Sequence, residues 1–207
     1  MCEEDEQRIE AIQFEELIQG LIENKYGSCN NFISPITILG LRDNLTERDT
    51  LGYLKTAGIG NNKDQHQDKL IRSDKINWIE ENSSNLFEKI YLDKIERFID
   101  YLNKTCFTSL KSFECHYSNF EKGSFYKKHT DQFKNEKGRK YSIVLYLNHD
   151  WKEEDDGMLS LYPSKNEQKN ISPLGGRMVF FESDAMEHEV HPSLTRDRKS
   201  IAGWLKD

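Results

Sequence analysis

The sequence predicts an α+β protein in which a mostly helical N-terminal half packs against a C-terminal β core. Up to about residue 105, long segments repeat apolar residues at helical spacing. From about residue 110 onward, short runs rich in β-branched and aromatic residues alternate with Gly, Pro, Asn and Asp, which is typical of a sandwich or barrel of short strands. Because 207 residues suit one sizeable domain, we expect a single domain over 1–207, with 1–105 as helical support and 106–207 as the β core that carries the site.

The composition argues against some classes of binding partner. The formal net charge is −7, which argues against a nucleic-acid binder and allows a neutral or cationic protein substrate. No run approaches the roughly 18 apolar residues of a membrane span, and the N-terminal "MCEEDEQRIE" lacks the apolar core of a signal peptide. The cysteines form no CxxC pair, so we expect free thiols in a reducing cytoplasm, with no membrane partner. These cysteines are Cys2, Cys29, Cys106 and Cys115.

The first predicted helix covers residues 3–27. Its first turn is acidic, and Gly27 stands where a C-terminal cap belongs. The next segment, "FISPITILGL" at 32–41, is an extended apolar run. Apolar residues at helical spacing in the first helix include Ile9, Ile12, Leu17 and Leu21.

A second helix is expected over residues 44–58, with Asn44 or Thr46 as its N-cap and Gly58 as its stop. The polar stretch that follows, "GIGNNKDQHQDKL", has no apolar period and is predicted to be a loop. Residues 71–81 then return to extended structure.

A third helix is predicted over residues 83–104, capped by Ser83 or Ser84. Its buried stripe is expected to include Leu86, Ile90, Phe98 and Leu102. The strand-like runs that follow are "SFECHYSNF", "GSFYKKHTDQF", "YSIVLYLN", "GMLSLYP", "GGRMVFFES", "HEVHPS" and "KSIAGWL".

Two His-x-Asp pairs compete as half of a metal site. In "FYKKHTDQF" the pair is His129 and Asp131, and in "QHQDK" it is His66 and Asp68. On a strand, the side chains of residues i and i+2 point to the same face and can coordinate one ion together. In a loop the same pair has no fixed direction, and ordering it costs about 1–2 kcal/mol per residue. The strand context therefore favours His129 and Asp131.

A third ligand must come from elsewhere, because an open non-haem iron site uses two histidines and one carboxylate. The histidines downstream are His149, His188 and His191. His149 lies in a charged, turn-like stretch, and His191 points to the opposite face from His188. His188, which follows the apolar strand "RMVFF", is the favoured ligand.

Arg198, ten residues after His188, is a candidate carboxylate clamp, that is, a side chain that binds a carboxylate of a co-substrate. Such an iron site usually binds a 2-oxo acid, whose distal carboxylate pairs best with the planar fork of an arginine. In strand alternation, Arg198, Ser200 and Trp204 share one face. The alternatives are a solvated surface charge for Arg198 and plain core for Trp204, and Arg196 competes for the clamp.

These segments together resemble the iron- and 2-oxoglutarate-dependent prolyl hydroxylases, specifically the branch of the hypoxia-inducible-factor prolyl hydroxylases and their bacterial relatives. The resemblance runs in order from about residue 57 to the C-terminus. Two departures are Ser73 and Asp156-Gly157, where the family has glycine and Gly-Gly. The matching segments are "AGIG", "IRSDKINWIEE", "FYKKHTD", "YSIVLYLNHDW", "DGMLSLYP", "GRMVFFESDAMEHEVHP" and "RKSIAGW".

The resemblance implies a double-stranded β-helix (jelly-roll) core and assigns roles to individual residues. It makes His129, Asp131 and His188 the iron ligands. Arg198 and Tyr146 match the residues that hold the distal carboxylate of 2-oxoglutarate. Tyr117 falls near the family's tyrosine that lies at the iron-bound end of the co-substrate. The alternative is that Tyr117 is an ordinary aromatic residue of a strand. The remaining expected residues are Ser200 and Trp204 around the co-substrate, and Gly58, Gly60, Arg72, Asp74 and Trp78 in a lid over the substrate.

The implied activity is an Fe(II)- and 2-oxoglutarate-dependent dioxygenase that hydroxylates a prolyl residue of a protein substrate, with ascorbate as a candidate further cofactor and a monomer as the favoured state. One alternative is a dioxygenase of the same fold that acts on a nucleobase or small molecule. Others are a metal-binding module without turnover and a zinc hydrolase, although the latter has no use for Arg198 or Tyr146.

Overall fold

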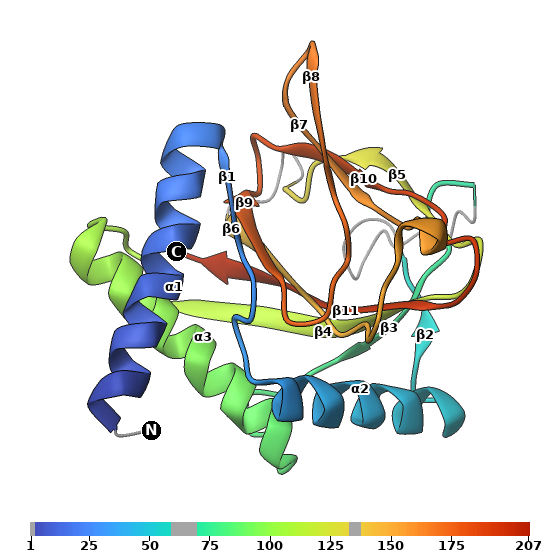
Figure 1. The fold of residues 1–207 in the computed structure, drawn as a ribbon, viewed down its shortest axis with the longest axis horizontal. Helices are drawn as coiled ribbons and strands as arrows, with labels where there is room; N and C mark the ends of the chain where they lie inside the picture. Colours follow the sequence, from blue (N-terminus) through green and yellow to red (C-terminus); the bar gives the residue numbers. More distant parts are fainter. Residues whose placement is uncertain (1–2, 59–69, 133–137) are drawn as a thin grey trace.

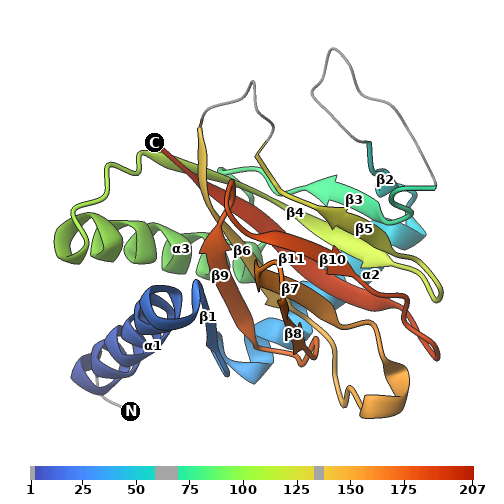
Figure 2. The ribbon, with the colours of Figure 1, turned by 90° about the horizontal axis from the view of Figure 1, so that it is seen from above.

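The computed structural model describes residues 3–58, 70–132 and 138–207, and within them two antiparallel sheets face each other (Figure 1). Figure 2 shows strands of the minor sheet lying over strands of the major sheet. In spatial order, the major sheet contains β1 (Tyr26–Cys29), β9 (Met178–Glu182), β6 (Arg139–Tyr146), β11 (Arg198–Lys206), β4 (Ser112–Phe120), β3 (Lys75–Trp78) and β2 (Lys55–Thr56). The minor sheet contains β5 (Tyr126–His129), β10 (Glu187–Val190), β7 (Leu159–Ser164) and β8 (Glu167–Ile171).

The helices cover the face of the major sheet that points away from the minor sheet (Figure 1). They are α1 (Glu3–Asn24), α2 (Pro35–Thr50) and α3 (Leu86–Thr105). Side chains alternate across a strand, so each face of the major sheet has its own apolar core. The helix side buries Leu17, Leu41, Phe98 and Phe180 among others. The cavity side buries a smaller cluster that includes Tyr146 and Phe181. The expected α+β fold with a double-stranded β-helix core is thus confirmed.

The first helix ends earlier than expected, because Lys25 rather than Gly27 leaves the helical conformation with φ 67°. Gly27 lies in β1, paired with Phe180. A Cβ at Gly27 would lie 2.0 Å from the carbonyl oxygen of Leu17, so the glycine permits close contact between β1 and α1. The prediction of Gly27 as a helix cap was wrong. Two of the expected stripe residues, Ile9 and Ile12, are also exposed.

The second helix begins nine residues before the expected start and ends at Thr50. The Ser34 hydroxyl accepts a hydrogen bond from the backbone N–H of Thr37 at 3.3 Å, and Pro35 occupies the first helical position, where its missing N–H costs nothing. The extended prediction for 32–41 was therefore wrong from Pro35 onward. Neither Asn44 nor Thr46 caps the helix, and Gly58 does not end it.

The third helix starts at Leu86 and is capped by Asn85, whose side-chain oxygen accepts from the N–H groups of Phe87 and Glu88. The expected caps Ser83 and Ser84 lie two residues and one residue too early, respectively. Of the expected stripe, Phe98 and Leu102 are buried, whereas Leu86 and Ile90 are exposed.

Each predicted strand-like run contains a strand, and among the described residues the strands that were not predicted are short or polar. Those were β1, β2 and β8. Cys29, Cys106 and Cys115 are free thiols, as expected, and Cys2 lies outside the described residues. None of the described helices is both long and apolar enough to cross a membrane.

Candidate functional site

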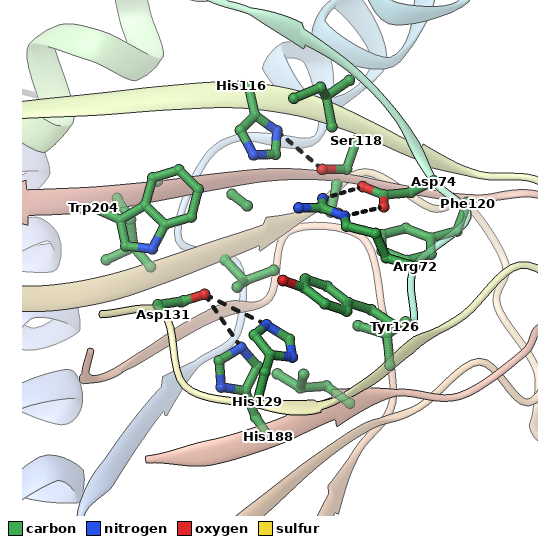
Figure 3. Close-up of a pocket in the computed structure, with 18 of the residues that line it drawn as sticks. Arg72, Asp74, His116, Ser118, Phe120, Tyr126, His129, Asp131, His188 and Trp204 are labelled. Atoms are coloured by element: carbon green, nitrogen blue, oxygen red, sulfur yellow. Dashed lines mark hydrogen bonds and ion pairs between the residues drawn. The ribbon is translucent and has the colours of Figure 1, made fainter. Parts of the chain in front are cut away.

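Three potential metal ligands meet in a cavity between the two sheets (Figure 3). His129 ends β5 and is the direct cross-strand partner of His188 on β10, so both imidazoles leave the same face of the minor sheet. Asp131 follows β5 by two residues. One ligand atom from each residue lies within 4.8 Å of the others, and the Nε2 atoms of both histidines lie 3.6 Å from Oδ1 of Asp131.

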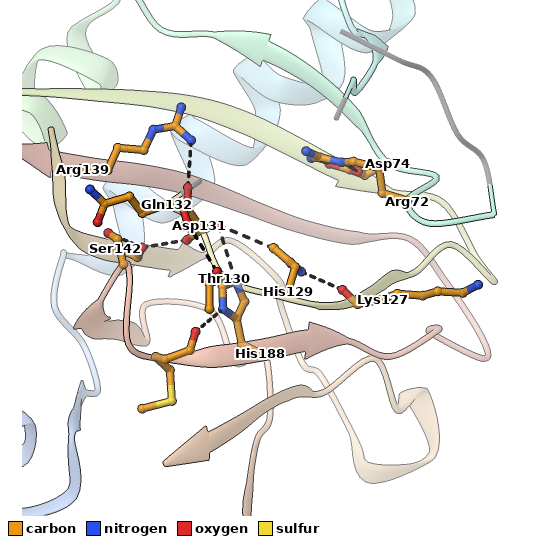
Figure 4. A network of polar contacts seen from close by, with 12 residues as sticks. Arg72, Asp74, Lys127, His129, Thr130, Asp131, Gln132, Arg139, Ser142 and His188 are labelled. Atoms are coloured by element: carbon orange, nitrogen blue, oxygen red, sulfur yellow. Dashed lines mark hydrogen bonds and ion pairs between the residues drawn. The ribbon is translucent and has the colours of Figure 1, made fainter. Parts of the chain in front are cut away.

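The tautomer of both histidines suits metal binding. Nδ1 of His129 lies 2.7 Å from the carbonyl oxygen of Lys127, and Nδ1 of His188 lies 3.1 Å from that of Met186 (Figure 4). Because a carbonyl oxygen only accepts, each Nδ1 carries the proton and donates it. Each Nε2 is left with a lone pair directed towards Asp131, which is the form that binds metals.

The carboxylate of Asp131 is oriented by the major sheet. Its Oδ2 accepts a hydrogen bond from the Ser142 hydroxyl at 2.7 Å, and that hydroxyl lies 2.8 Å from the hydroxyl of Ser183. The backbone N–H of Asp131 donates to the carbonyl of Ser183. These contacts occupy one carboxylate oxygen and leave Oδ1 facing the two imidazoles.

The protonation states fit a divalent cation. Burial raises the pKa of Asp131, but the neighbouring His188 and His129 and the Ser142 hydrogen bond lower it further, so it lies well below its usual range. Burial lowers the pKa of His188 to about 4, more than the Asp131 charge raises it. At neutral pH Asp131 is therefore a carboxylate and His188 a neutral imidazole. Two histidines and one carboxylate are the donor set of a facial triad for Fe(II).

A buried guanidinium lies in the same cavity. Arg198 is 1% exposed, and its guanidinium lies 4.9 Å from the ring centroid of Tyr146 and 5.1 Å from that of Phe120. Among the described residues no carboxylate forms an ion pair with it, and Arg198 Nε and the Tyr146 hydroxyl are buried without a hydrogen-bond partner. An uncompensated buried charge is costly, so these groups fit an anion that enters from outside, and a carboxylate matches the guanidinium best.

Two other residues expected around the co-substrate, Ser200 and Trp204, line the cavity, whereas Tyr146 is not among its lining residues. Ser200 and Trp204 follow Arg198 in strand alternation along β11. The indole N–H of Trp204 is buried and has no acceptor among the described residues. The competing arginine, Arg196, is paired with Asp155 at 2.7 Å and does not line the cavity. The clamp prediction for Arg198 therefore has geometric support that Arg196 lacks.

The structure does not bring Tyr117 to the cavity. Its side chain lies in the core on the helix side of the major sheet, where its hydroxyl accepts a hydrogen bond from Nδ2 of Asn44 at 3.1 Å. Strand alternation is the reason, because the neighbours of Tyr117 on β4 point the other way. His116 and Ser118 line the cavity in its place.

His116 is a cavity residue that the sequence reasoning missed. Its ring lies 5.1 Å from that of Trp78 and 5.4 Å from that of Trp204, and Nδ1 lies 3.1 Å from the carbonyl oxygen of Tyr117. Burial lowers its pKa to about 4, so the ring is neutral at neutral pH. Knowing which residues of β4 face the cavity would have identified His116 as a cavity residue.

Four of the residues expected in a lid form part of the cavity wall. Gly58, Arg72, Asp74 and Trp78 line it from β3 and the segments on either side of the 59–69 gap. Gly60, like the rival pair His66 and Asp68, lies outside the described residues.

Tyr126 and Arg139 are among the cavity residues that the sequence did not predict. Tyr126 stacks on His129 with ring centroids 3.5 Å apart, and Arg139 lies 3.6 Å from the ring centroid of Trp204. No spacing rule singles out either residue, because each contact depends on how the strands are placed in space.

Comparison with known proteins agrees with this geometry. Residues 115–206 match the model of the 2OG-Fe(II) oxygenase superfamily. Human Egl nine homolog 1 is 30% identical over 200 residues, which cover 89% of this chain and 45% of the human protein. The rat protein of the same name is also 30% identical, with 56% of its length covered. The chain thus spans about half the length of these relatives.

Two solved structures share the fold. A Pseudomonas putida prolyl-4-hydroxylase is 27% identical, with a TM-score of 0.83 over 93% of this chain and 98% of the other. A Trichoplax adhaerens prolyl hydroxylase, solved with a peptide fragment of the hypoxia-inducible-factor oxygen degradation domain, is 24% identical, with a TM-score of 0.88 over 100% of this chain and 94% of the other.

Proposed function

We propose that this chain, whose residues 115–206 match the 2OG-Fe(II) oxygenase superfamily, is an Fe(II)- and 2-oxoglutarate-dependent dioxygenase that hydroxylates a prolyl residue of a protein. The observation that carries this proposal is the pairing, in one cavity, of the His129, Asp131 and His188 cluster with a buried Arg198 that has no carboxylate partner among the described residues. A zinc hydrolase needs no such arginine.

Each part of the cavity has a defined task in this reaction. Bound Fe(II), with 2-oxoglutarate and O2, supplies the oxidation of a substrate C–H bond and yields succinate and carbon dioxide. His129, Asp131 and His188 would hold the metal, and Arg198 with the Tyr146 hydroxyl would anchor the distal carboxylate of 2-oxoglutarate. The protein thereby contributes orientation and the exclusion of water.

A prolyl residue in a protein is the favoured target because the two solved structures compared above are named prolyl hydroxylases, and one was solved with a peptide. The part of the cavity wall formed by Trp78, His116 and Trp204 is aromatic, which suits a compact apolar ring. We propose further that the enzyme works in the cytoplasm as a monomer, with ascorbate as a candidate reductant. The alternative is a dioxygenase of the same fold with a non-prolyl or small-molecule substrate.

The first test needs no knowledge of the substrate. Anaerobic addition of Fe(II) and 2-oxoglutarate to the metal-free protein should give a weak visible charge-transfer band, and admission of air should then produce succinate. A His129→Ala variant should give neither signal. A chain that binds Fe(II) but forms no band and no succinate would be a metal-binding module, and the proposed activity would be wrong.

The second test identifies the target. Proteins captured from a lysate by the enzyme are incubated with Fe(II), 2-oxoglutarate and air, and their peptides are examined by mass spectrometry. The expected result is the gain of one oxygen atom on a proline, absent with the His129→Ala enzyme. Oxygen gained on another residue type would keep the dioxygenase and reject the prolyl target.

A further inference from the structure

The two histidine ligands are held in different ways. His188 lies on β10, which is paired on both sides by β5 and β7, and its ring contacts that of Phe181 at 4.9 Å. Its side chain is 7% exposed. His129 ends β5, the edge strand of the minor sheet, and its side chain is 16% exposed. Because an edge strand is paired within its sheet on one side only, His129 requires support from outside that sheet.

That support comes from a stack of side chains. The ring of Tyr126 lies against the His129 imidazole, with centroids 3.5 Å apart and planes 17° apart. The Arg72 guanidinium lies 4.3 Å from the Tyr126 ring centroid, and Figure 3 shows Tyr126 between Arg72 and His129. Stacking of this kind restrains rotation of the imidazole about its side-chain bonds.

Arg72 is itself fixed by a buried acid. Its Nε and one terminal nitrogen donate to the two carboxylate oxygens of Asp74 at 2.8 and 2.7 Å, and the other terminal nitrogen donates to the carbonyl of Gly58 at 3.3 Å. Asp74 is fully buried. The bidentate pair sets the plane of the guanidinium, and it also balances a positive charge that would otherwise repel a nearby metal cation.

The backbone around Arg72 closes the free edge of β5. The N–H of Lys127 donates to the carbonyl of Ile71 at 2.9 Å, and the N–H of Ser73 donates to that of Phe125 at 3.1 Å. Arg72 and Tyr126 form a bridge between these bonds. Residues 71–73 therefore fix the position of β5 as well as the side chains stacked on it.

We propose that Asp74, Arg72 and Tyr126 form a positioning column that holds the His129 imidazole with Nε2 directed at the metal. The proposal rests on the proposed function, since it presupposes that the cluster binds a metal. The three residues are positioning residues: they act through His129, and each contributes to metal affinity without touching the ion.

The main test is a titration of the metal-free protein with Co(II) alone. Tyr126→Leu removes the stacked ring and should weaken Co(II) binding by about tenfold, the scale at which partners of metal ligands act. Tyr126→Phe keeps the ring and should bind within about twofold of the wild type. Wild-type affinity in a folded Tyr126→Leu protein would overturn the proposal.

Arg72 supplies a second variant, with Lys128 on β5 as the site of a matched control. Arg72→Met should weaken Co(II) binding by about threefold, because the Tyr126 ring remains but loses its support. Lys128→Met is the control: the Lys128 ammonium lies 3.9 Å from the Tyr162 ring centroid and pairs with Glu187, away from the ligands. Lys128→Met should leave the Co(II) affinity unchanged. An equal loss of affinity in Lys128→Met and Arg72→Met would show a general effect of β5 substitutions and would reject the column.

A readout without metal separates this proposal from the proposed function. Nitrogen-15 NMR of the metal-free protein should show His129 protonated at Nδ1 in the wild type and in Tyr126→Phe, and a mixture of tautomers in Tyr126→Leu at an unchanged fold. Identical tautomers in all three proteins would reject the column. A wild-type protein that binds no Co(II), yet shows this tautomer difference, would reject the proposed function and keep the column.

Discussion

Arg198 carries a buried positive charge that no carboxylate among the described residues balances. It is buried in the cavity beside Tyr146 and has no carboxylate partner among the described residues. Burial lowers its pKa, which expresses the cost of keeping the charge out of water. A bound anion would offset this cost. Substitution of Arg198 therefore tests whether that anion is 2-oxoglutarate.

Arg198→Ala should raise the concentration of 2-oxoglutarate needed for half-maximal succinate production by about 10- to 100-fold, since a charge-assisted bidentate hydrogen bond contributes about 1.5–3 kcal/mol. The matched control is Arg196→Ala, which removes an arginine paired with Asp155 outside the cavity. That variant should show the wild-type dependence. Unchanged dependence in Arg198→Ala would exclude Arg198 as the carboxylate partner.

His116 should make stability depend on pH. Its folded pKa of about 4 lies below the ordinary value of 6.5, so the unfolded chain takes up a proton first as the pH falls. The contribution to stability is complete above about pH 6.5 and is lost as the pH falls towards 4, with about 1 kcal/mol gone by about pH 5.5. Urea unfolding of the metal-free wild type and His116→Gln at about pH 7.5 and 5.5 measures the difference. An equal loss in both proteins would show that His116 does not titrate in this way.

At the scale of elements, the contact between α1 and β1 depends on a glycine. A Cβ at Gly27 would lie 2.0 Å from the carbonyl oxygen of Leu17, which is backbone and cannot rotate away. Gly27→Ala should therefore lower the free energy of unfolding by about 3 kcal/mol, at the upper end for overpacking. Gly52→Ala is the comparison: Gly52 has φ +77° and no atom near the added Cβ, so it should lose only about 1 kcal/mol. Urea unfolding measures both, and equal losses would contradict the steric argument.

Helix existence was predictable, and helix limits were not. The helical spacing predicts that three helices exist, but the apolar run "FISPITILGL", which predicts extended structure, conceals the helix start at Ser34-Pro35. Asn85 was missed as a cap for a related reason: Ser83, Ser84 and Asn85 are all good caps, and tertiary packing chooses among them. The strand β8 was missed because most of its residues are polar and exposed.

The meeting of the three candidate metal ligands was predictable because their positions obey local rules. His129 and Asp131 lie two apart beside a strand, and His188 follows an apolar strand. Tyr117 shows the limit of such reasoning, because an error of one residue in register moves a side chain to the opposite face. The stacking of Tyr126 on His129 depends on backbone placement that spacing alone does not encode.

At the scale of the whole molecule, the two sheets contribute different halves of the site. The minor sheet carries His129 and His188, whereas Arg198 and Tyr146 belong to the major sheet. Asp131 joins the halves, since its carboxylate accepts from Ser142 on β6. The histidines that would hold the metal and the residues that would hold the distal carboxylate of 2-oxoglutarate therefore come from different sheets.

Ligand binding should consequently stabilise the sheets against separation. Co(II) with 2-oxoglutarate should raise the unfolding temperature above that with Co(II) alone and should slow amide hydrogen exchange in β5. Arg198→Ala should retain the increment from Co(II) and lose the increment from 2-oxoglutarate. If 2-oxoglutarate has the same effect on both proteins, it does not bridge the two sheets through Arg198.

The β7–β8 hairpin projects from the molecule and ends the minor sheet at β8 (Figure 1). The outer edge of β8 has no strand partner in the described sheet, which leaves backbone donors and acceptors open to a second molecule. Residues Glu167 to Asn170 are exposed, and Glu167 pairs with Lys169 at 3.5 Å. Charged side chains at an open edge discourage strand addition, so this hairpin protects the protein from edge-to-edge aggregation at high concentration.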